Sequence, residues 1–178
     1  GLLVLPTHRI VKNLESFDRE NLLRHCENSF DITRNLSKED AEHRLKEAYS
    51  RQKAAFLLYT KSGYDLLVSK LSAVPENLLE GSESLRSLDV SILHSLVLEK
   101  IMGIDKENMA KQINLTYTRS EQEAAKAVDS GAAQCAFILN PTRVEEIKNV
   151  ALDGEKMPQK STYFYPKLIT GLVMNGLE

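Results

Sequence analysis

Residues 54–71, AAFLLYTKSGYDLLVSKL, decide the fold, because a turn signal separates two apolar runs there. Residues 54–59 and 64–71 have the aromatic and aliphatic composition of strands. The connecting residues 60–63, TKSG, end in a glycine that can adopt the positive φ of a tight turn. The pattern predicts a β-hairpin, to which the rest of the chain is added.

The chain before the hairpin begins with an apolar run. Residues 2–5 predict a strand, and the following Pro6-Thr7-His8-Arg9 predicts a polar loop. Ser16 or Asp18 can cap a helix, and Ser37, which is followed by acidic residues, begins a charged helix. A strand, a loop and two helices therefore lead into the hairpin.

The chain after the hairpin alternates helices and strands. Residues 88–102 are apolar around most of a helical circumference, which predicts a central helix ended by Gly103. Residues 113–139 contain two strand patterns and a capping box at Ser120, and Asn140-Pro141 predicts the start of another helix. This β-α-β-α segment and the hairpin predict an α+β fold, in which helices pack on a mixed β-sheet.

Two polar residues of the central helix are interpreted as structural. Asp89 is expected to cap the helix. His94 is expected to be a buried residue with a local hydrogen-bond partner rather than a catalyst.

Length and composition fit one substantial domain. The chain has 178 residues, of which 42% are hydrophobic, so we expect one core and a single domain over residues 1–178. Residues 74–87 contain a proline, a glycine and several serines, and predict an exposed connector where a boundary between two lobes would fall. Because the chain opens on an apolar strand without a methionine, we expect a fragment of a longer polypeptide.

Charge and cysteine content exclude several classes of partner. A net charge of −2 gives no broad attraction for nucleic acid. No apolar run reaches the roughly 20 residues that span a bilayer, so we expect no membrane association. Cys26 and Cys135 match no metal or disulfide spacing, and no metal or cofactor is expected. A cytoplasmic location follows, and oligomer formation stays open.

The closing motif, residues 157–167 with the sequence MPQKSTYFYPK, predicts one half of a binding site. Lys160 is next to the hydroxyls of Ser161 and Thr162, and Lys167 follows a proline. Ammonium groups neutralise an oxyanion and hydroxyls donate directional hydrogen bonds to it, so phosphate or carboxylate is the expected ligand. The alternative is that the hydroxyls bond turn backbone and the lysines are solvated.

Thr7, His8 and Arg9 form the other half of the predicted site. They follow a strand directly, where ligands bind in open α/β sheets. Arg9 could bind an oxyanion bidentately, with Thr7 beside it, and His8 could transfer a proton, because an unperturbed histidine titrates near ~6.5. The alternative is a structural loop whose histidine and arginine bind backbone carbonyls or a nearby acid.

Four separated motifs carry a resemblance to a known family. They are LPTHR at 5–9, LDVSILH at 88–94, FILNPT at 137–142 and MPQKSTYFYPK at 157–167. In this order they are similar to the carboxy-terminal half of the bacterial and archaeal family called domain of unknown function 1015. The resemblance spans the chain and implies that family members are longer, but the family has no settled activity to carry over.

Two functions stay open. The first is part of a cytoplasmic metabolic enzyme, in which Arg9, Lys160 and Lys167 hold a phosphorylated or carboxylated small molecule and His8 is the general acid or base. Phosphoryl transfer is the leading reaction class. The second is a non-catalytic domain that completes a larger protein by receiving its missing amino-terminal half. The enzyme hypothesis requires the opening and closing motifs to converge on a pocket.

Overall fold

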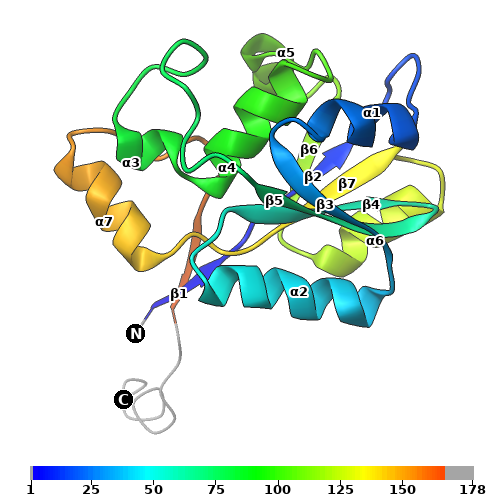
Figure 1. Cartoon of the computed structure of the whole chain (residues 1–178), viewed down its shortest axis with the longest axis horizontal. Coiled ribbons are helices and arrows are strands. Elements are labelled where there is room, and N and C mark those ends of the chain that lie inside the picture. The colour runs from blue at the N-terminus through cyan, green and yellow to red at the C-terminus, as the bar shows by residue number, and fades with distance from the viewer. Residues whose placement is uncertain (1, 167–178) are drawn as a thin grey trace, which may run out of the picture.

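The computed structural model describes residues 2–166, and its central feature is a sheet between two layers of helices (Figure 1). The strands are β1 (Leu2–Leu5), β2 (His8–Val11), β3 (Phe30–Leu36), β4 (Ala55–Thr60), β5 (Gly63–Ser69), β6 (Leu115–Thr118), β7 (Cys135–Leu139) and β8 (Tyr163–Pro166). The helices are α1 (Arg19–Cys26), α2 (Lys38–Ser50), α3 (Glu83–Arg86), α4 (Asp89–Ile92), the π-helix η1 (Leu93–Glu99), α5 (Lys106–Lys111), α6 (Glu121–Asp129) and α7 (Val144–Leu152).

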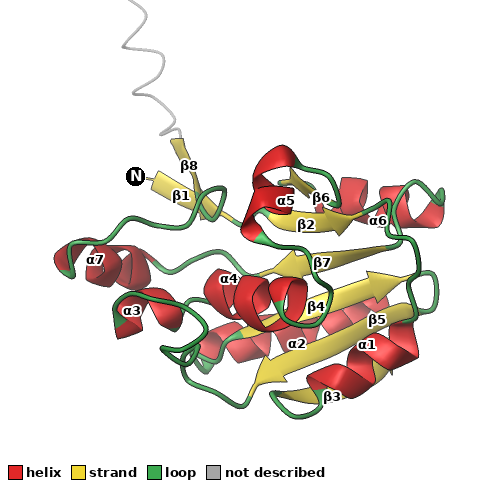
Figure 2. Ribbon diagram, turned by 90° about the horizontal axis from the view of Figure 1, so that it is seen from above, coloured by secondary structure: helices red, strands yellow, loops and turns green. Residues whose placement is uncertain are grey.

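The main sheet has six strands in the order β3-β5-β4-β7-β2-β6, and β1 and β8 form a separate two-stranded ribbon. Helices α1, α4 and α5 lie over one face of the main sheet, and α2 and α6 lie over the other (Figure 2). The α+β fold expected from the sequence is therefore confirmed. No helix in the described part of the chain is long and apolar enough to cross a bilayer.

The predicted hairpin is present as β4 and β5. Strands β4 and β5 pair in antiparallel register from Ala55 opposite Val68 to Thr60 opposite Gly63. Gly63 has a φ of 114°, a backbone conformation that is strained for any residue with a Cβ. The glycine therefore sets the turn, as its place in the sequence indicated.

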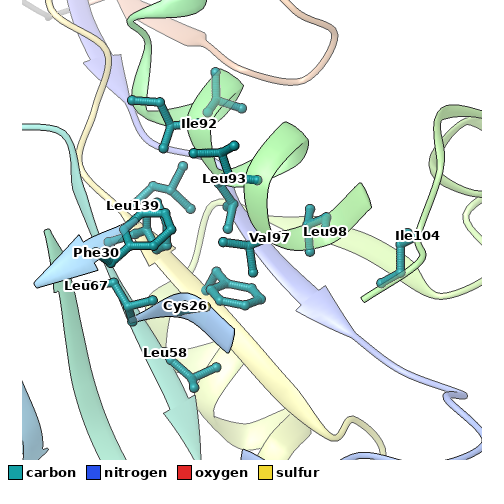
Figure 3. Close-up of a cluster of buried hydrophobic side chains, with 14 of the residues drawn as sticks. Cys26, Phe30, Leu58, Leu67, Ile92, Leu93, Val97, Leu98, Ile104 and Leu139 are labelled. Carbon is teal, nitrogen blue, oxygen red and sulfur yellow. The ribbon is translucent and has the colours of Figure 1, made fainter. Parts of the chain in front are cut away.

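Alternation along the strands divides the interior into two cores. Phe56 and Leu58 of β4 pack with α1 and η1, whereas Ala55 and Leu57 pack with α2 and α6. Figure 3 shows the first core, where side chains from η1, such as Leu93, meet those of the sheet. Both faces of the sheet are covered, which explains why β4 and β7 are apolar at nearly every position.

The sheet is antiparallel in every pair, whereas we expected a mixed sheet. The predicted β-α-β unit is present as β6, α6 and β7, and these two strands run in the same direction. Strand β2 lies between them and pairs antiparallel with both. The insertion of a strand from the start of the chain, far away in sequence, could not be predicted from the local pattern.

The predicted central helix is present but is not a regular α-helix. It begins as α4 and widens into η1, where the Met102 N–H donates to the Val97 carbonyl five residues earlier at 2.9 Å. Asp89 does not cap it, because the N-cap is Leu88, and the Asp89 carboxylate instead accepts from the Ala55 N–H at 3.4 Å. The apolar pattern indicated a helix without revealing the extra residue per turn.

The segment Pro6-Thr7-His8-Arg9 is not the polar loop that the sequence predicted. His8 and Arg9 are the first residues of β2, so the chain makes only a short break at Pro6 and Thr7 between β1 and β2. Proline cannot donate to a sheet ladder, which accounts for the break at this point. Helix α7 also begins later than predicted, at Val144 with Arg143 as N-cap.

Candidate functional site

The opening and closing motifs meet in space. Strand β1 pairs with β8 so that Leu5 lies opposite Tyr163. Strand β2 then enters the main sheet, and the Arg9 Nη2 donates to the Lys160 carbonyl at 3.1 Å, across 151 residues of sequence. Thr7, Arg9, Lys160, Ser161 and Thr162 are therefore neighbours, while Lys167 lies outside the described residues.

Arg9 is completely buried. Its Nε donates to the His94 Nε2 at 3.1 Å and its Nη1 donates to the Thr7 carbonyl. The guanidinium carbon also lies 5.1 Å from the centroid of the Tyr117 ring. With the Lys160 carbonyl, these partners are all formally neutral. In this conformation the guanidinium does not present its fork to a ligand, because protein groups already occupy it.

No ion pair joins Arg9 to a carboxylate within residues 2–166. Burial lowers the pKa of Arg9 to about 10, so the group stays charged at neutral pH. A buried charge without an opposite charge is energetically costly, because desolvation is not offset by Coulomb attraction. The site is therefore electrostatically incomplete and favours an anion nearby.

His8 is 3% exposed, and its Nδ1 accepts a hydrogen bond from the Leu139 N–H at 3.1 Å. Burial, followed by the charge of Arg9, lowers the pKa of His8 to about 4. The ring is therefore neutral at physiological pH, with its proton on Nε2. His8 holds β2 against β7, and only its Nε2–H is left for any proton transfer.

A polar pocket of about 750 Å³ opens where the two motifs meet. It is lined by Thr7, Tyr117, Thr118, Arg119, Ser120, Glu123, Lys160, Thr162 and Tyr163. Two cations line it, Arg119 from the segment between β6 and α6 and Lys160 from the closing motif. Arg9 is buried directly behind Thr7 and Tyr117. Among the described residues, Glu123 is the one carboxylate that lines the pocket, and it accepts from the Thr118 hydroxyl at 2.8 Å. The charge around the polar pocket is therefore positive on balance.

Lys160 has a φ of 57°, a left-handed conformation that is uncommon for a residue with a side chain. It places the carbonyl on Arg9 while the ammonium is 5.7 Å from the Tyr117 centroid at the pocket wall. Backbone outliers of this kind often accompany binding sites. Lys160 therefore contacts both the buried Arg9, through its carbonyl, and the polar pocket, through its side chain.

The two hydroxyls of the closing motif differ. Ser161 is buried, and its hydroxyl donates to the Pro158 carbonyl at 2.5 Å, so it closes the turn that presents Lys160. It lines a very small cavity with Thr7 and not the polar pocket. Thr162 is half-buried and does line the polar pocket.

Sequence reasoning missed the wall that β6 and α6 contribute. Tyr117, Arg119 and Ser120 lie at the β6–α6 junction, and the Arg119 guanidinium is 3.8 Å from the centroid of the Tyr163 ring. A signal was present in the sequence, since a basic and an aromatic residue precede the Ser120 helix cap. It could not be placed, because nothing local indicates that this junction meets the end of the chain.

Fold and site together define an α+β domain with a cationic pocket where the opening and closing motifs meet the β6–α6 junction. The chain belongs to the family described as "Protein of unknown function (DUF1015)", which matches residues 1–91. The family expected from the four motifs is thus confirmed, although the match covers the first half of the chain rather than its whole length. No curated protein is similar to the chain.

Solved structures share the fold at low sequence identity. A conserved hypothetical protein from Pyrococcus furiosus is 18% identical with a TM-score of 0.53. The alignment covers 95% of this chain and 58% of that protein. Structures of a free serine kinase in complex with AMP, and of a point mutant of a free serine kinase with ADP, are 16% and 14% identical with TM-scores of 0.50. This chain spans 54% of each kinase chain. At such identities the likeness concerns the fold alone.

Proposed function

We propose that this domain binds a phosphorylated or carboxylated small metabolite in the polar pocket, as part of a cytoplasmic metabolic enzyme. Phosphoryl transfer is the leading reaction class. The observation that carries the proposal is the buried Arg9 cation, which has no carboxylate partner in the described chain and lies directly behind the pocket wall. An anion in the polar pocket would supply the missing charge.

The pocket residues suit distinct parts of such a ligand. Lys160 and Arg119 can form charge-assisted hydrogen bonds with phosphate oxygens, and Thr162 can add a neutral donor. Arg9 contributes its positive potential through the wall without contact. Tyr117 offers an aromatic face beside the cations, against which a planar group could stack. Lys167 stays a predicted ligand-binding residue of the same motif.

The fold comparison supports the reaction class. A kinase of similar fold has been solved with AMP and with ADP, which are small phosphorylated anions. Because this chain spans just over half of that kinase chain, the activity proposed here belongs to a longer polypeptide. In that setting His8 remains a predicted proton-transfer residue acting through Nε2, and the missing amino-terminal half would supply the remaining groups.

The test is calorimetric titration of the full-length protein with inorganic phosphate, AMP and ADP. Lys160→Ala should weaken binding of the preferred anion about tenfold, the effect of losing one charge-assisted hydrogen bond. Arg119→Ala should act in the same direction. Both side chains are exposed, so the fold should be retained.

Lys148→Ala is the matched control, because Lys148 is an exposed lysine of α7 outside the polar pocket. It removes the same charge and should leave the affinity unchanged. Equal affinity in wild type, Lys160→Ala and Arg119→Ala would rule out the polar pocket as the site.

One observation favours the alternative, a non-catalytic domain that completes a larger protein. On the β1–β8 ribbon, Leu3 is 49% exposed and Phe164 is 45% exposed. The ribbon stands apart from the main sheet (Figure 2), so these apolar side chains could pack against another part of the polypeptide. If Leu3→Ser and Phe164→Ser together destabilise the full-length protein while anion titrations show no binding, this alternative is favoured.

A further inference from the structure

A second cavity, of about 320 Å³, shares Tyr117 with the polar pocket and is called here the apolar cavity. Its walls are mostly apolar and include Leu85 and Met109. Polar side chains line it as well, and four of them, Ser91, His94, Ser95 and Glu99, come from the helix formed by α4 and η1. Apolar walls combined with placed polar groups are typical of small-molecule sites.

Ser91 has an unsatisfied hydroxyl. The residue is 4% exposed, and its Oγ has no hydrogen-bond partner among residues 2–166, although it lines the apolar cavity. A helical serine commonly donates to the carbonyl four residues earlier, and this one does not. Burying a hydroxyl without a partner costs free energy, so a ligand that accepts from it would recover that cost.

His94 offers a second donor to the same cavity. Its Nε2 accepts from the Arg9 Nε–H and must therefore carry a lone pair, which puts the proton of the neutral ring on Nδ1. Burial and the charge of Arg9 lower the pKa of His94 to about 3, so the ring is neutral at physiological pH. Nδ1 bonds no other residue in the described range. The predicted local partner for His94 was wrong, since its partner is 85 residues away.

The two donors are held at an unusual place in the helix. Ser91 is the third residue of α4 and His94 the second of η1, so one helical turn separates them across the junction. Short π-helical segments are less favourable than α-helix and occur often at functional sites. The junction brings both donors to one cavity wall.

The charge at the cavity selects the sign of the ligand. Lys106 and Lys156 line it, and Glu99 is the one carboxylate that lines it in the described part of the chain. We propose that the apolar cavity binds a small monocarboxylate with an aliphatic or aromatic body, whose oxygens accept from Ser91 and His94. The apolar walls would cover the body of the molecule. This site is separate from the polar pocket and does not depend on the function proposed for it.

The probes are benzoate and hexanoate, with benzyl alcohol and hexanol as uncharged counterparts. Titrated into the full-length protein, the carboxylates should bind about tenfold more tightly than the alcohols, because charge-assisted hydrogen bonds are stronger. They should also shift the His94 Nδ1–H resonance in NMR spectra. Ser91→Ala should weaken carboxylate binding about fivefold and raise the melting temperature of the free protein, since it removes an unsatisfied group.

Two further variants locate the site. Ala110→Phe, at an exposed lining residue, should fill the cavity and abolish carboxylate binding. Ser50→Ala is the matched control, since this exposed helical serine already donates to the Lys46 carbonyl at 3.1 Å. Carboxylates that do not bind, or that bind Ser91→Ala and Ala110→Phe as well as wild type, would overturn the proposal. Loss of carboxylate binding in Lys160→Ala would also overturn it, by placing the ligand in the polar pocket.

Discussion

Two arginines, Arg19 of α1 and Arg9 of β2, differ in the groups that neutralise their charge. Arg19 forms a bidentate pair with Asp65 of β5, at 2.8 Å from Nε and 2.6 Å from Nη2, and the Asp65 side chain is fully buried. Arg9 of β2 is also buried, but it bonds two carbonyls and an imidazole instead. The first arrangement is complete within the described chain, whereas the second has an unbalanced charge beside a pocket.

The difference shows how a structural cation can be distinguished from a functional one. Asp65 also accepts from the Asn35 N–H at 3.0 Å, so its oxygens are satisfied by the fold and nothing remains for a ligand. At Arg9 the side chain is bonded just as fully, yet no compensating charge lies next to it within residues 2–166. Burial alone therefore does not identify a site, and the balance of charge around a buried group is the more informative property.

The largest predicted effect on stability is at the Arg19–Asp65 pair. Asp65→Ala should lower the free energy of unfolding by about 3–5 kcal/mol, because it removes the buried carboxylate that pairs with Arg19 and accepts from the Asn35 N–H, and leaves Arg19 with the exposed Glu20. Urea denaturation monitored by circular dichroism measures the change. Glu76→Ala is the control, since this exposed glutamate makes a long 3.5 Å contact with Arg86, and it should change stability by less than about 0.5 kcal/mol. Equal effects of the two substitutions would contradict the assignment.

The next largest effect is a dependence of stability on pH that comes from the two histidines beside Arg9. His8 and His94 have pKa values lowered to about 4 and about 3, so the unfolded chain binds more protons than the folded one as pH falls below 6.5. Their contribution is present above pH 6.5 and is lost toward acid, by about 3–4 kcal/mol between pH 7 and pH 5.

Asp89 opposes this trend. Burial, with the nearby charge of Glu146, raises the pKa of Asp89 to about 7, so its contribution to stability falls as pH rises from 4 to 7. Asp89→Asn should remove the opposition and make the acid-induced loss larger than in wild type. Urea denaturation at pH 7 and pH 5 measures both. An unchanged difference between the two pH values in Asp89→Asn would show that the carboxyl does not offset the histidines.

The smallest effect on stability is expected for Arg9→Met. Methionine keeps much of the side-chain volume, and removing an unbalanced buried charge offsets the lost hydrogen bonds, so stability should change by about 1 kcal/mol or less. Binding of the phosphate or nucleotide preferred in the polar pocket should nevertheless weaken, because the potential behind the wall is gone. A loss of stability as large as that of Asp65→Ala would mean that Arg9 is balanced within the full-length protein.

Local patterns predicted the elements better than their arrangement. The hairpin at Gly63 and the helix caps at Ser37 and Ser120 depend on neighbouring residues and were predicted from the sequence, which also offered Asp18 as one of two caps for α1. The position of β2 between β6 and β7 depends on pairing across the whole chain and was not. The π-helix was missed because an apolar run has the same appearance in either helix type.

The candidate site followed the same rule. Lys160 and Arg9 were paired from their motifs, but the β6–α6 junction was missed, since its meeting with the chain end is a long-range contact. His8 and Arg9 were expected in an accessible loop, and their burial reflects the continuation of the strand through Ile10 and Val11. Composition indicated which side chains carry charge, whereas only packing determines which of them reach solvent.

The Arg9 guanidinium links the polar pocket to the apolar cavity. One edge donates to His94 at the apolar cavity, and another donates to the Lys160 carbonyl at the polar pocket. A ligand in one cavity that moves the guanidinium must also change the hydrogen bond that Arg9 donates at the other cavity. Thermodynamic linkage then requires that each ligand change the affinity of the other by the same factor, so a ligand in one cavity would alter binding in the other.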